Sequence, residues 1–335
     1  MTATMRAMVL ERPGLLADGP LIAREMPLPE AAPGMLVVRV AACGVCRTDL
    51  QLAEGDLKAH LLPLVPGHQI VGTVESVGPG VTAWRTGDRV GAAWLGAACG
   101  VCEACRGGRE NLCEKAQFTG WDMHGGFATH VAVRADFALH LPPRFDDVEA
   151  APLLCGGIIG YRAFKRSGIE PGGKLGLYGF GASALITIQI ARHFGCRIFV
   201  ATRSPRERDA ARDLGAEWTG GYGDSPGVPL DAAITFAPSG DVVHAALRAL
   251  GRGGKVAINA IHLDRLPEMP YADLWWERGL VSVANFTRDD AREFLELAAD
   301  IPVRTARETY PLVDANVALR RQRDGLVHGA AVLVP

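Results

Sequence analysis

The sequence predicts an α/β protein of two domains, in which a β-rich N-terminal part precedes a doubly wound parallel sheet. Three observations lead to this fold class. The chain has 335 residues, a length typical of two domains. Short apolar segments bounded by glycine and proline turns dominate the residues before Pro152. After Pro152, apolar strands alternate with helical segments, which is typical of a parallel sheet.

The N-terminal part contains four apolar segments that we expect to be strands of an antiparallel or barrel-like sheet, at residues 36–42, 69–77, 88–93 and 127–133. The second part begins with an apolar helix at 153–164. Strands follow at 174–178, 197–202, 231–236, 255–260 and 280–284, with helices from the glycine turn to about 194, at 205–214 and at 241–250. At the end, helices at 289–299 and 313–321 alternate with strands at 308–311 and 329–334, and we expect this tail to pair with the N-terminal domain.

Charge and hydropathy exclude several classes of protein. Lys and Arg number 35 against 37 Asp and Glu, a net charge of −2, which leaves no basic footprint for nucleic acid. No uncharged apolar run is long enough for a membrane span, and the N-terminal segment MTATMRAMVLERPG lacks the apolar run of a secretory signal. We therefore expect a cytoplasmic protein, in which clustered cysteines are metal ligands or catalytic groups rather than disulfides.

The strongest motif is CGVCEACRGGRENLC, which spaces four of the eight cysteines as C-x2-C-x2-C-x7-C, at Cys99, Cys102, Cys105 and Cys113. A tetrahedron of four thiolates is the usual ligand set of structural zinc. Gly107 and Gly108 allow the chain to turn back and deliver the last cysteine. An iron–sulfur cluster is the main alternative, because short cysteine spacings also serve clusters.

A second, dispersed set comprises Cys46 in CGVCRTDL, His68 in PGHQIVG and Cys155 in PLLCGGIIGY. Two thiolates and one imidazole are the ligand set of a catalytic zinc with an open fourth position. Spacing alone does not establish this site, since a single Cys or His is more often a core or surface residue. Read alone, Cys43-x2-Cys46 is equally a redox pair or a ligand pair.

The segment LYGFGASA contains Gly179-x-Gly181-x-x-Ala184 between an expected strand and an expected helix, which is the context of a dinucleotide-binding turn. Gly179 permits the tight turn, and Gly181 lets the backbone approach a pyrophosphate at the helix N-terminus. Ala184 replaces the third glycine, which is an allowed variant.

Six segments follow one another in the chain in this order: CGVCRTDL, PGHQIVGTVESVGPGV, GDRVGAAW, the four-cysteine lobe, PLLCGG and the glycine turn. With these segments the chain resembles the zinc-dependent medium-chain alcohol dehydrogenases, near the bacterial cinnamyl-alcohol-type and broad-range branch. The resemblance covers nearly the whole chain. It implies a GroES-like catalytic domain at 1–156 and 282–335, with a zinc lobe at about 95–115, and a Rossmann domain at 157–281. It also implies an active site in the cleft between the domains.

The resemblance implies that Cys46, His68 and Cys155 bind a catalytic zinc, so that Cys43 is a packed residue and the chain binds two zinc ions. Asp49 matches the carboxylate that orients the histidine ligand, with a turn or capping role as the alternative. Thr48 matches the hydroxyl that takes the alcohol proton, and Arg47 is expected to contact the cofactor.

Two residues depart from the family pattern. Gln51 stands where many relatives have a histidine that continues the proton relay. Because Gln is no general base, the relay must end in ribose and water or elsewhere. Gln69 stands where the family usually has Glu after the histidine ligand, which removes a negative charge near the metal.

The implied reaction is reversible hydride transfer between a primary alcohol, aliphatic or aromatic, and its aldehyde with NAD(P). A polyol or secondary-alcohol dehydrogenase is the closer alternative, and a non-enzymatic zinc protein of the same fold the more distant one. Trp94 matches a pocket aromatic of relatives, and Trp121 is a second candidate for the substrate pocket, although each is equally consistent with ordinary core.

The sequence slightly favours NADP over NAD. NAD enzymes usually place Asp or Glu at the end of the second strand, whereas this strand ends in Ala-Thr-Arg-Ser-Pro-Arg, with no carboxylate before Glu207. A 2′-phosphate would bind Arg203, with Thr202 and Ser204 as hydroxyl donors and Arg206 nearby. The alternative is that Arg203 and Arg206 are a solvated helix start.

We also expect a homotetramer or homodimer. The resemblance implies it, and the expected strand at 280–284 is a candidate edge strand that a partner's sheet can extend.

Overall fold

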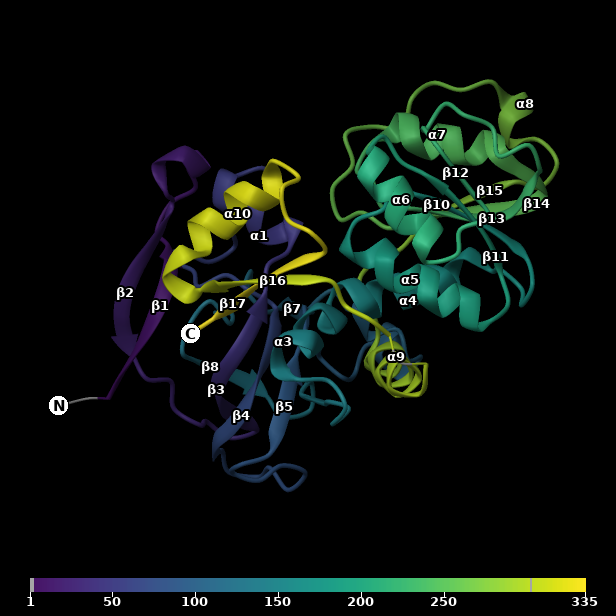
Figure 1. The fold of residues 1–335 in the computed structure, drawn as a ribbon. Coiled ribbons are helices and arrows are strands. Elements are labelled where there is room, and N and C mark those ends of the chain that lie inside the picture. The colour runs from purple at the N-terminus through teal and green to yellow at the C-terminus, as the bar shows by residue number, and fades with distance from the viewer. Residues whose placement is uncertain (1–2, 302) are drawn as a thin grey trace. The chain divides into compact units, whose positions relative to one another are not determined.

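The computed structural model describes residues 3–301 and 303–335, which form two compact units (Figure 1). The first unit contains the residues up to Cys155 together with Phe286–Glu296 and Thr305–Pro335. The second contains Gly156–Asn285 and Leu297–Arg304. No helix in the described part of the chain combines the length and apolar composition that a bilayer span requires.

The first unit is built on a seven-stranded sheet in the order β16-β17-β3-β4-β5-β9, with β8 also paired to β3. All of its pairs are antiparallel except β16 with β17. Its strands are β3 (Met35–Gly44), β4 (Gln69–Val77), β5 (Arg89–Ala92), β8 (His130–Arg134), β9 (Leu139–His140), β16 (Arg307–Pro311) and β17 (Ala330–Val334).

The pairing of β3 with β4 is the feature of this sheet that positions the site. Their register sets Cys43 opposite Ile70 and Gly44 opposite Gln69. The chain therefore leaves β3 toward Cys46 at the same end of the sheet at which His68 enters β4. The C-terminal tail closes the other side of β3, because Leu333 of β17 pairs with Cys43, and the structure thus shows the pairing that we expected of the tail.

The remaining elements of the first unit complete its core. A hairpin of β1 (Thr4–Leu10) and β2 (Leu21–Pro27), which our reading of the sequence did not predict, packs with α10 and the sheet around one hydrophobic cluster. Its helices are α1 (Arg47–Glu54), α2 (Glu103–Arg106), α3 (Asp147–Ala150), α10 (Ala315–Arg323) and most of α9 (Arg288–Asp300).

The second unit is a parallel six-stranded sheet in the order β12-β11-β10-β13-β14-β15. In chain order this is 3-2-1-4-5-6, the order of a doubly wound nucleotide-binding sheet. Its strands are β10 (Lys174–Tyr178), β11 (Arg197–Ala201), β12 (Trp218–Gly220), β13 (Leu230–Thr235), β14 (Leu250–Ile258) and β15 (Gly279–Ser282). Its helices are α4 (Gly156–Ser167), α5 (Ala182–His193), α6 (Pro205–Asp213), α7 (Gly240–Ala249) and α8 (Tyr271–Leu274).

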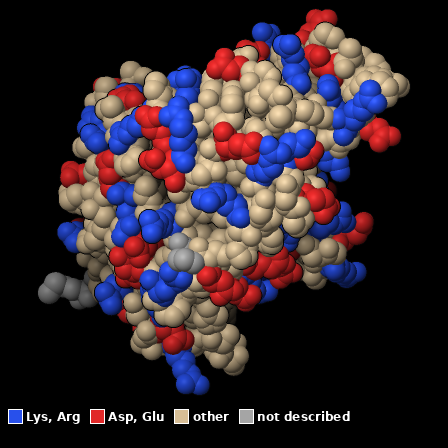
Figure 2. Space-filling view, turned by 45° about the vertical axis from the view of Figure 1, so that its right-hand side comes forward, with Lys and Arg blue, Asp and Glu red and all other residues tan. Residues whose placement is uncertain are grey.

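The surface carries both signs of charge. Figure 2 shows Lys and Arg side chains intermixed with Asp and Glu on the face that it draws, as the nearly balanced counts of 35 and 37 lead one to expect.

Candidate active site and metal sites

The four-cysteine lobe is closed at its base by a short antiparallel pair, β6 (Leu95–Ala97) with β7 (Gln117–Phe118). Between these strands the chain brings the sulfur atoms of Cys99, Cys102, Cys105 and Cys113 within 4.8 Å of one another. Gly108 adopts a φ of +67°, so the turn after α2 uses a backbone conformation that favours glycine. Four converging thiols fit a tetrahedral zinc, and these are the four residues that the sequence predicts.

Backbone amides point at the sulfur atoms of this lobe. Cys102 N donates to Cys99 Sγ at 3.4 Å, Cys105 N to Cys102 Sγ at 3.5 Å, and Cys99 N to Cys113 Sγ at 3.5 Å. The amides of Val101 and Cys102 lower the pKa of Cys99 to about 6, because hydrogen bonds to the sulfur stabilise the thiolate. Cys99 is thus favoured as a thiolate, the form that binds a metal, whereas burial raises the pKa of Cys105 to about 12.

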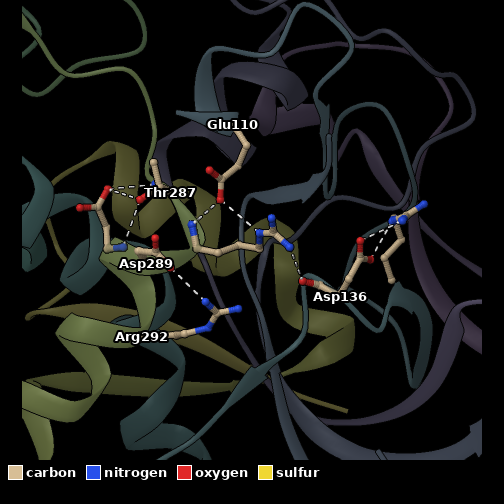
Figure 3. Close-up of polar contacts among 8 residues, drawn as sticks. Glu110, Asp136, Thr287, Asp289 and Arg292 are labelled. Atoms are coloured by element: carbon tan, nitrogen blue, oxygen red, sulfur yellow. Dashed lines mark hydrogen bonds and ion pairs between the residues drawn. The ribbon is translucent and has the colours of Figure 1, made fainter. Parts of the chain in front are cut away.

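A buried carboxylate fixes the lobe to α9, and our reading of the sequence missed it (Figure 3). Glu110, which lies between the third and fourth cysteines, is only 6% exposed. Its Oε1 accepts from the backbone N of Arg288 at 3.0 Å and from Nε at 3.1 Å. Burial opposes ionisation of Glu110, but these donors outweigh it and lower its pKa. The Arg288 guanidinium also donates to Asp136 O at 3.3 Å, so one arginine joins the lobe, α9 and the loop after β8.

The second group brings together three residues that lie far apart in the sequence. Cys46 caps the start of α1, His68 directly precedes β4, and Cys155 follows the 3₁₀ segment Ala151–Leu154. Their ligand atoms lie within 4.8 Å of one another, and the two sulfur atoms are 3.9 Å apart. Two thiols and an imidazole match the protein donor set of a catalytic zinc. Cys43 does not join them and is buried in the hydrophobic core.

Asp49 connects the two ends of this group. Its Oδ2 accepts from Cys46 N at 2.7 Å, which caps α1, and its Oδ1 accepts from Gly67 N at 3.0 Å. The same Oδ1 lies 3.5 Å from Nδ1 of His68, whose ring is 1% exposed. Gly67 has a φ of +95°, and a Cβ there would lie 2.4 Å from Phe127, so only glycine fits. Asp49 therefore caps the helix and also faces the histidine.

The charges of the group are coupled. A hydrogen bond between the Cys46 and Cys155 sulfur atoms holds the pKa of Cys46 well below its usual range and raises that of Cys155. Burial opposes protonation of His68, but the Asp49 carboxylate and the Cys46 thiolate outweigh it and raise its pKa to about 10. The low pKa of Cys46 favours its thiolate, which is the form of cysteine that binds a metal.

The other predicted residues around this group differ in their exposure. Thr48 is 8% exposed, and its Oγ1 lies 3.7 Å from Cys46 Sγ. Gln51 and Gln69 are both buried, and Gln69 packs over Gly44, where a Cβ would lie 2.8 Å from its side-chain oxygen. Arg47 is exposed at the start of α1.

An aromatic stack leads away from His68. The ring of Trp94 meets His68 edge-on, with centroids 4.7 Å apart, and stacks on Trp121 at 5.5 Å. Phe118 stacks on both tryptophans, and His60 stacks on Trp121 with ring centroids 4.1 Å apart. Trp121 is further fixed by its Nε1, which donates to Lys58 O at 2.8 Å. Trp94 and Trp121 thus belong to one aromatic stack that contacts His68, together with Phe118 and His60, which our reading of the sequence did not single out.

The glycine turn of the second unit has space for a ligand. Gly179 has a φ of +92°, and its N–H donates to Ala201 O at 2.8 Å. This hydrogen bond holds the turn after β10 against the end of the neighbouring strand β11. A Cβ at Gly181 would meet nothing within 4 Å, so protein packing does not require glycine there. Gly181 is also the N-cap of α5 and provides no side-chain cap, which leaves the first amides of the helix for an anion. Ala184 is fully buried.

The predicted ribose-binding residues follow β11. Thr202 is 1% exposed, Arg203 and Arg206 are exposed, and Ser204 caps α6 by accepting from Glu207 N at 3.3 Å. Our reading of the sequence did not place Glu207 at the strand end. In the structure its carboxylate accepts a hydrogen bond from the Thr202 hydroxyl.

Comparisons with known proteins agree with this geometry. Residues 32–143 match the family described as alcohol dehydrogenase GroES-like domain, and residues 184–300 match the zinc-binding dehydrogenase family. A probable alcohol dehydrogenase, AdhA, of Mycobacterium tuberculosis is 50% identical over 339 residues, which cover 99% of this chain and 98% of that protein. An alcohol dehydrogenase of Geobacillus stearothermophilus is 32% identical over 98% of this chain and 99% of its own length.

Solved structures give the same result. A thermostable alcohol dehydrogenase from Pyrobaculum aerophilum superposes with a TM-score of 0.91 at 26% identity, over 99% of this chain and 100% of that one. A cinnamyl alcohol dehydrogenase from Sorghum bicolor superposes with a TM-score of 0.88 at 26% identity, over 99% of this chain and 98% of that one.

This chain belongs to the zinc-containing medium-chain alcohol dehydrogenases. The predicted fold class is confirmed, as a GroES-like domain and a Rossmann-type NAD(P)-binding domain with a parallel six-stranded sheet. The protein is an oxidoreductase that acts on CH–OH groups, and it contains two zinc-site-like groups.

The two groups predict different consequences of losing one thiol. Cys155→Ser should lower the zinc content from two ions to one per chain and reduce activity by about 100-fold or more, with the melting temperature nearly unchanged. Cys102→Ser should instead lower the melting temperature by several degrees, because structural zinc contributes folding free energy. Metal analysis and thermal unfolding measure both effects.

The matched control is Cys196→Ser, since Cys196 is a buried thiol outside both groups. It should keep two zinc ions and full activity. Fully active wild-type protein with one zinc ion per chain would contradict the assignment.

Proposed function

We propose that this enzyme interconverts primary alcohols, including aromatic ones, and their aldehydes with NAD(P) as the hydride carrier. The observation that carries the proposal is the convergence of Cys46, His68 and Cys155 with the Thr48 hydroxyl beside them. The aromatic wall of Trp94 and Trp121 supports substrates with a flat ring. The similarity to a cinnamyl alcohol dehydrogenase, at 26% identity, is consistent with this substrate class.

In this proposal Cys46, His68 and Cys155 hold the catalytic zinc. When bound, zinc supplies Lewis acidity toward the substrate oxygen. Asp49 faces Nδ1 of His68, so Nε2 is the nitrogen left for the metal. Asp49 also holds the Cys46 and Gly67 amides, and it thereby fixes the direction from which two of the three ligands approach.

Thr48 takes the alcohol proton in this proposal. Its hydroxyl is a donor and an acceptor, so it can receive a proton from the substrate while it passes its own onward. The next group in many relatives would be a histidine, but the buried Gln51 stands in its place and cannot act as a base. With a cofactor bound, its ribose hydroxyls and water would supply the next acceptors for the Thr48 proton, unless the relay ends elsewhere.

The second unit binds the cofactor. Gly179 and Gly181 leave the first turn of α5 open to the pyrophosphate, and Ala184 packs the helix against the sheet. Arg203 supports NADP over NAD because it is exposed and lies two residues after β11, where a 2′-phosphate is expected, with Ser204 beside it. Arg47 on α1 is assigned to the cofactor through the resemblance.

We further propose a homotetramer or homodimer that forms through the β15 edge of the second unit. β15 is the last strand of the sheet and has one free backbone edge. Exposed aromatic side chains lie just before it, with Tyr271 68%, Trp275 50% and Trp276 46% exposed. Arg252 covers Trp276 at 3.7 Å, which keeps that ring in place. The eight free thiols support a cytoplasmic location, because reduced cysteines persist there.

A panel of alcohols tests the reaction. Zinc-loaded enzyme should oxidise benzylic and straight-chain primary alcohols with a kcat/KM above that for matched secondary alcohols, as measured by NAD(P)H absorbance. Trp121→Ala should reduce kcat/KM for the aromatic alcohols by about 10-fold while leaving a short aliphatic alcohol nearly unchanged, since a lost aromatic stack is worth roughly 1 kcal/mol.

Faster turnover of secondary alcohols or polyols would instead identify a polyol-type dehydrogenase. No turnover with any member of the panel would contradict the proposal entirely.

Light scattering tests the assembly. Wild-type protein at micromolar concentration should have a mass that is two or four times 35.6 kDa. Trp275→Glu should lower this mass, because a charge in an apolar interface is costly. Leu15→Glu is the control, since Leu15 is 68% exposed in the first unit, far along the chain from β15. A monomer mass for the wild type would contradict the assignment.

A further inference from the structure

The residues that follow β11 lie beside the nucleotide turn. Gly179 N donates to Ala201 O at 2.8 Å, so the turn after β10 is fixed to the last residue of β11. In a doubly wound sheet, the residue at this strand end meets the adenosine ribose. The inference below rests on the proposed binding of NAD(P) to this unit.

Glu207 brings a carboxylate to this strand end from the following helix. It lies in the first turn of α6, where its N–H is held by Ser204 Oγ at 3.3 Å. Its Oε2 accepts from the hydroxyl of Thr202, the residue directly after β11, and Thr202 is fully enclosed at 1% exposed. The side chain therefore bends back toward the strand, and its carboxylate contacts the side chain of the first residue after β11.

The charges around this carboxylate are not cancelled within the protein. Among residues 3–301 and 303–335, Glu207 forms no ion pair, and its partner is the neutral Thr202 hydroxyl. The neighbouring Arg208 donates its Nε to the backbone oxygen of Thr202 at 2.8 Å and forms no ion pair with Glu207 in the described part of the chain. Tyr222 reports the same surroundings: burial raises its pKa, the Glu207 charge raises it further, and Thr202 and Arg203 lower it. A carboxylate and the Arg203 guanidinium thus act on one region beside the ribose-binding strand end.

We propose that Glu207 recognises the adenosine ribose and opposes the binding of a 2′-phosphate. With NAD, the carboxylate accepts a hydrogen bond from the 2′-hydroxyl, as an acidic residue at the strand end does in other NAD-binding sheets. With NADP, the same negative charge repels the phosphate that Arg203 attracts. The choice of cofactor is then set by two opposing charges, and Glu207 limits the preference for NADP that Arg203 provides.

Two fragments that differ only in the phosphate test this role without turnover. Calorimetric titration with AMP and with 2′,5′-ADP gives the two dissociation constants for the wild type and for each variant. Glu207→Gln keeps an oxygen that can accept from Thr202 but removes the charge. It should tighten 2′,5′-ADP by about 10-fold relative to AMP and weaken AMP itself. The ratio of kcat/KM for NADP to that for NAD should rise to a similar extent.

Two further variants make the result specific. Arg203→Ala should shift both ratios in the opposite direction. Asp209→Asn removes an exposed carboxylate from the same helix, where it pairs with Arg212, and should leave both ratios unchanged. The role of Glu207 would be overturned if Glu207→Gln left the preference for the phosphorylated ligand unchanged while Arg203→Ala lowered it. The proposed function would remain intact in that case. Wild-type protein that binds neither fragment nor either dinucleotide would overturn the proposed cofactor site itself.

Discussion

The Asp49 carboxylate is the interaction on which the catalytic group depends. It is fully buried, and a buried charge is costly unless it is hydrogen-bonded. Here it accepts from the amides of Cys46 and Gly67 and faces His68, so its satisfaction requires both ligand segments to be in place. The β3–β4 register delivers these segments to one end of the sheet. Folding the sheet and forming the metal site are therefore one structural requirement.

The two metal groups show what a sequence can and cannot reveal. The lobe cysteines lie within fifteen residues, so their spacing alone predicts a site, and the structure brings their sulfurs together. The pairing of β3 with β4 brings Cys46 and His68 together, and Cys155 joins them from the 3₁₀ segment Ala151–Leu154. Spacing does not encode this arrangement, so the residues only suggested the set and the resemblance to a known family supported it. Glu110 was missed for the same reason, because its partner Arg288 lies far along the chain.

The second unit likewise shows that local patterns can be predicted from the sequence and that contacts across element boundaries cannot. Periodicity and glycine turns predicted β10, α5, β11 and α6 to within one or two residues, because each is a local pattern with its own end signals. The β1–β2 hairpin was missed, since its outer strand is mostly exposed and lacks a clear alternation. The strand end appeared to lack a carboxylate because Glu207 belongs to the next helix, and only its hydrogen bond with Thr202 shows where the charge lies. Side chains that reach back across an element boundary leave no local signature.

The most direct measurement of the central role of Asp49 is the zinc affinity of the catalytic group in Asp49→Asn, by competition with a chromogenic chelator. Asn has a single side-chain oxygen, so it can accept from only one of the two backbone amides. Its NH₂ group would then face the other amide, which is also a donor. We expect affinity for the catalytic zinc to fall about 10- to 100-fold, as is typical when the partner of a histidine ligand is lost. The lobe zinc should be retained. Unchanged affinity at the catalytic group, or equal loss of both ions, would contradict this account.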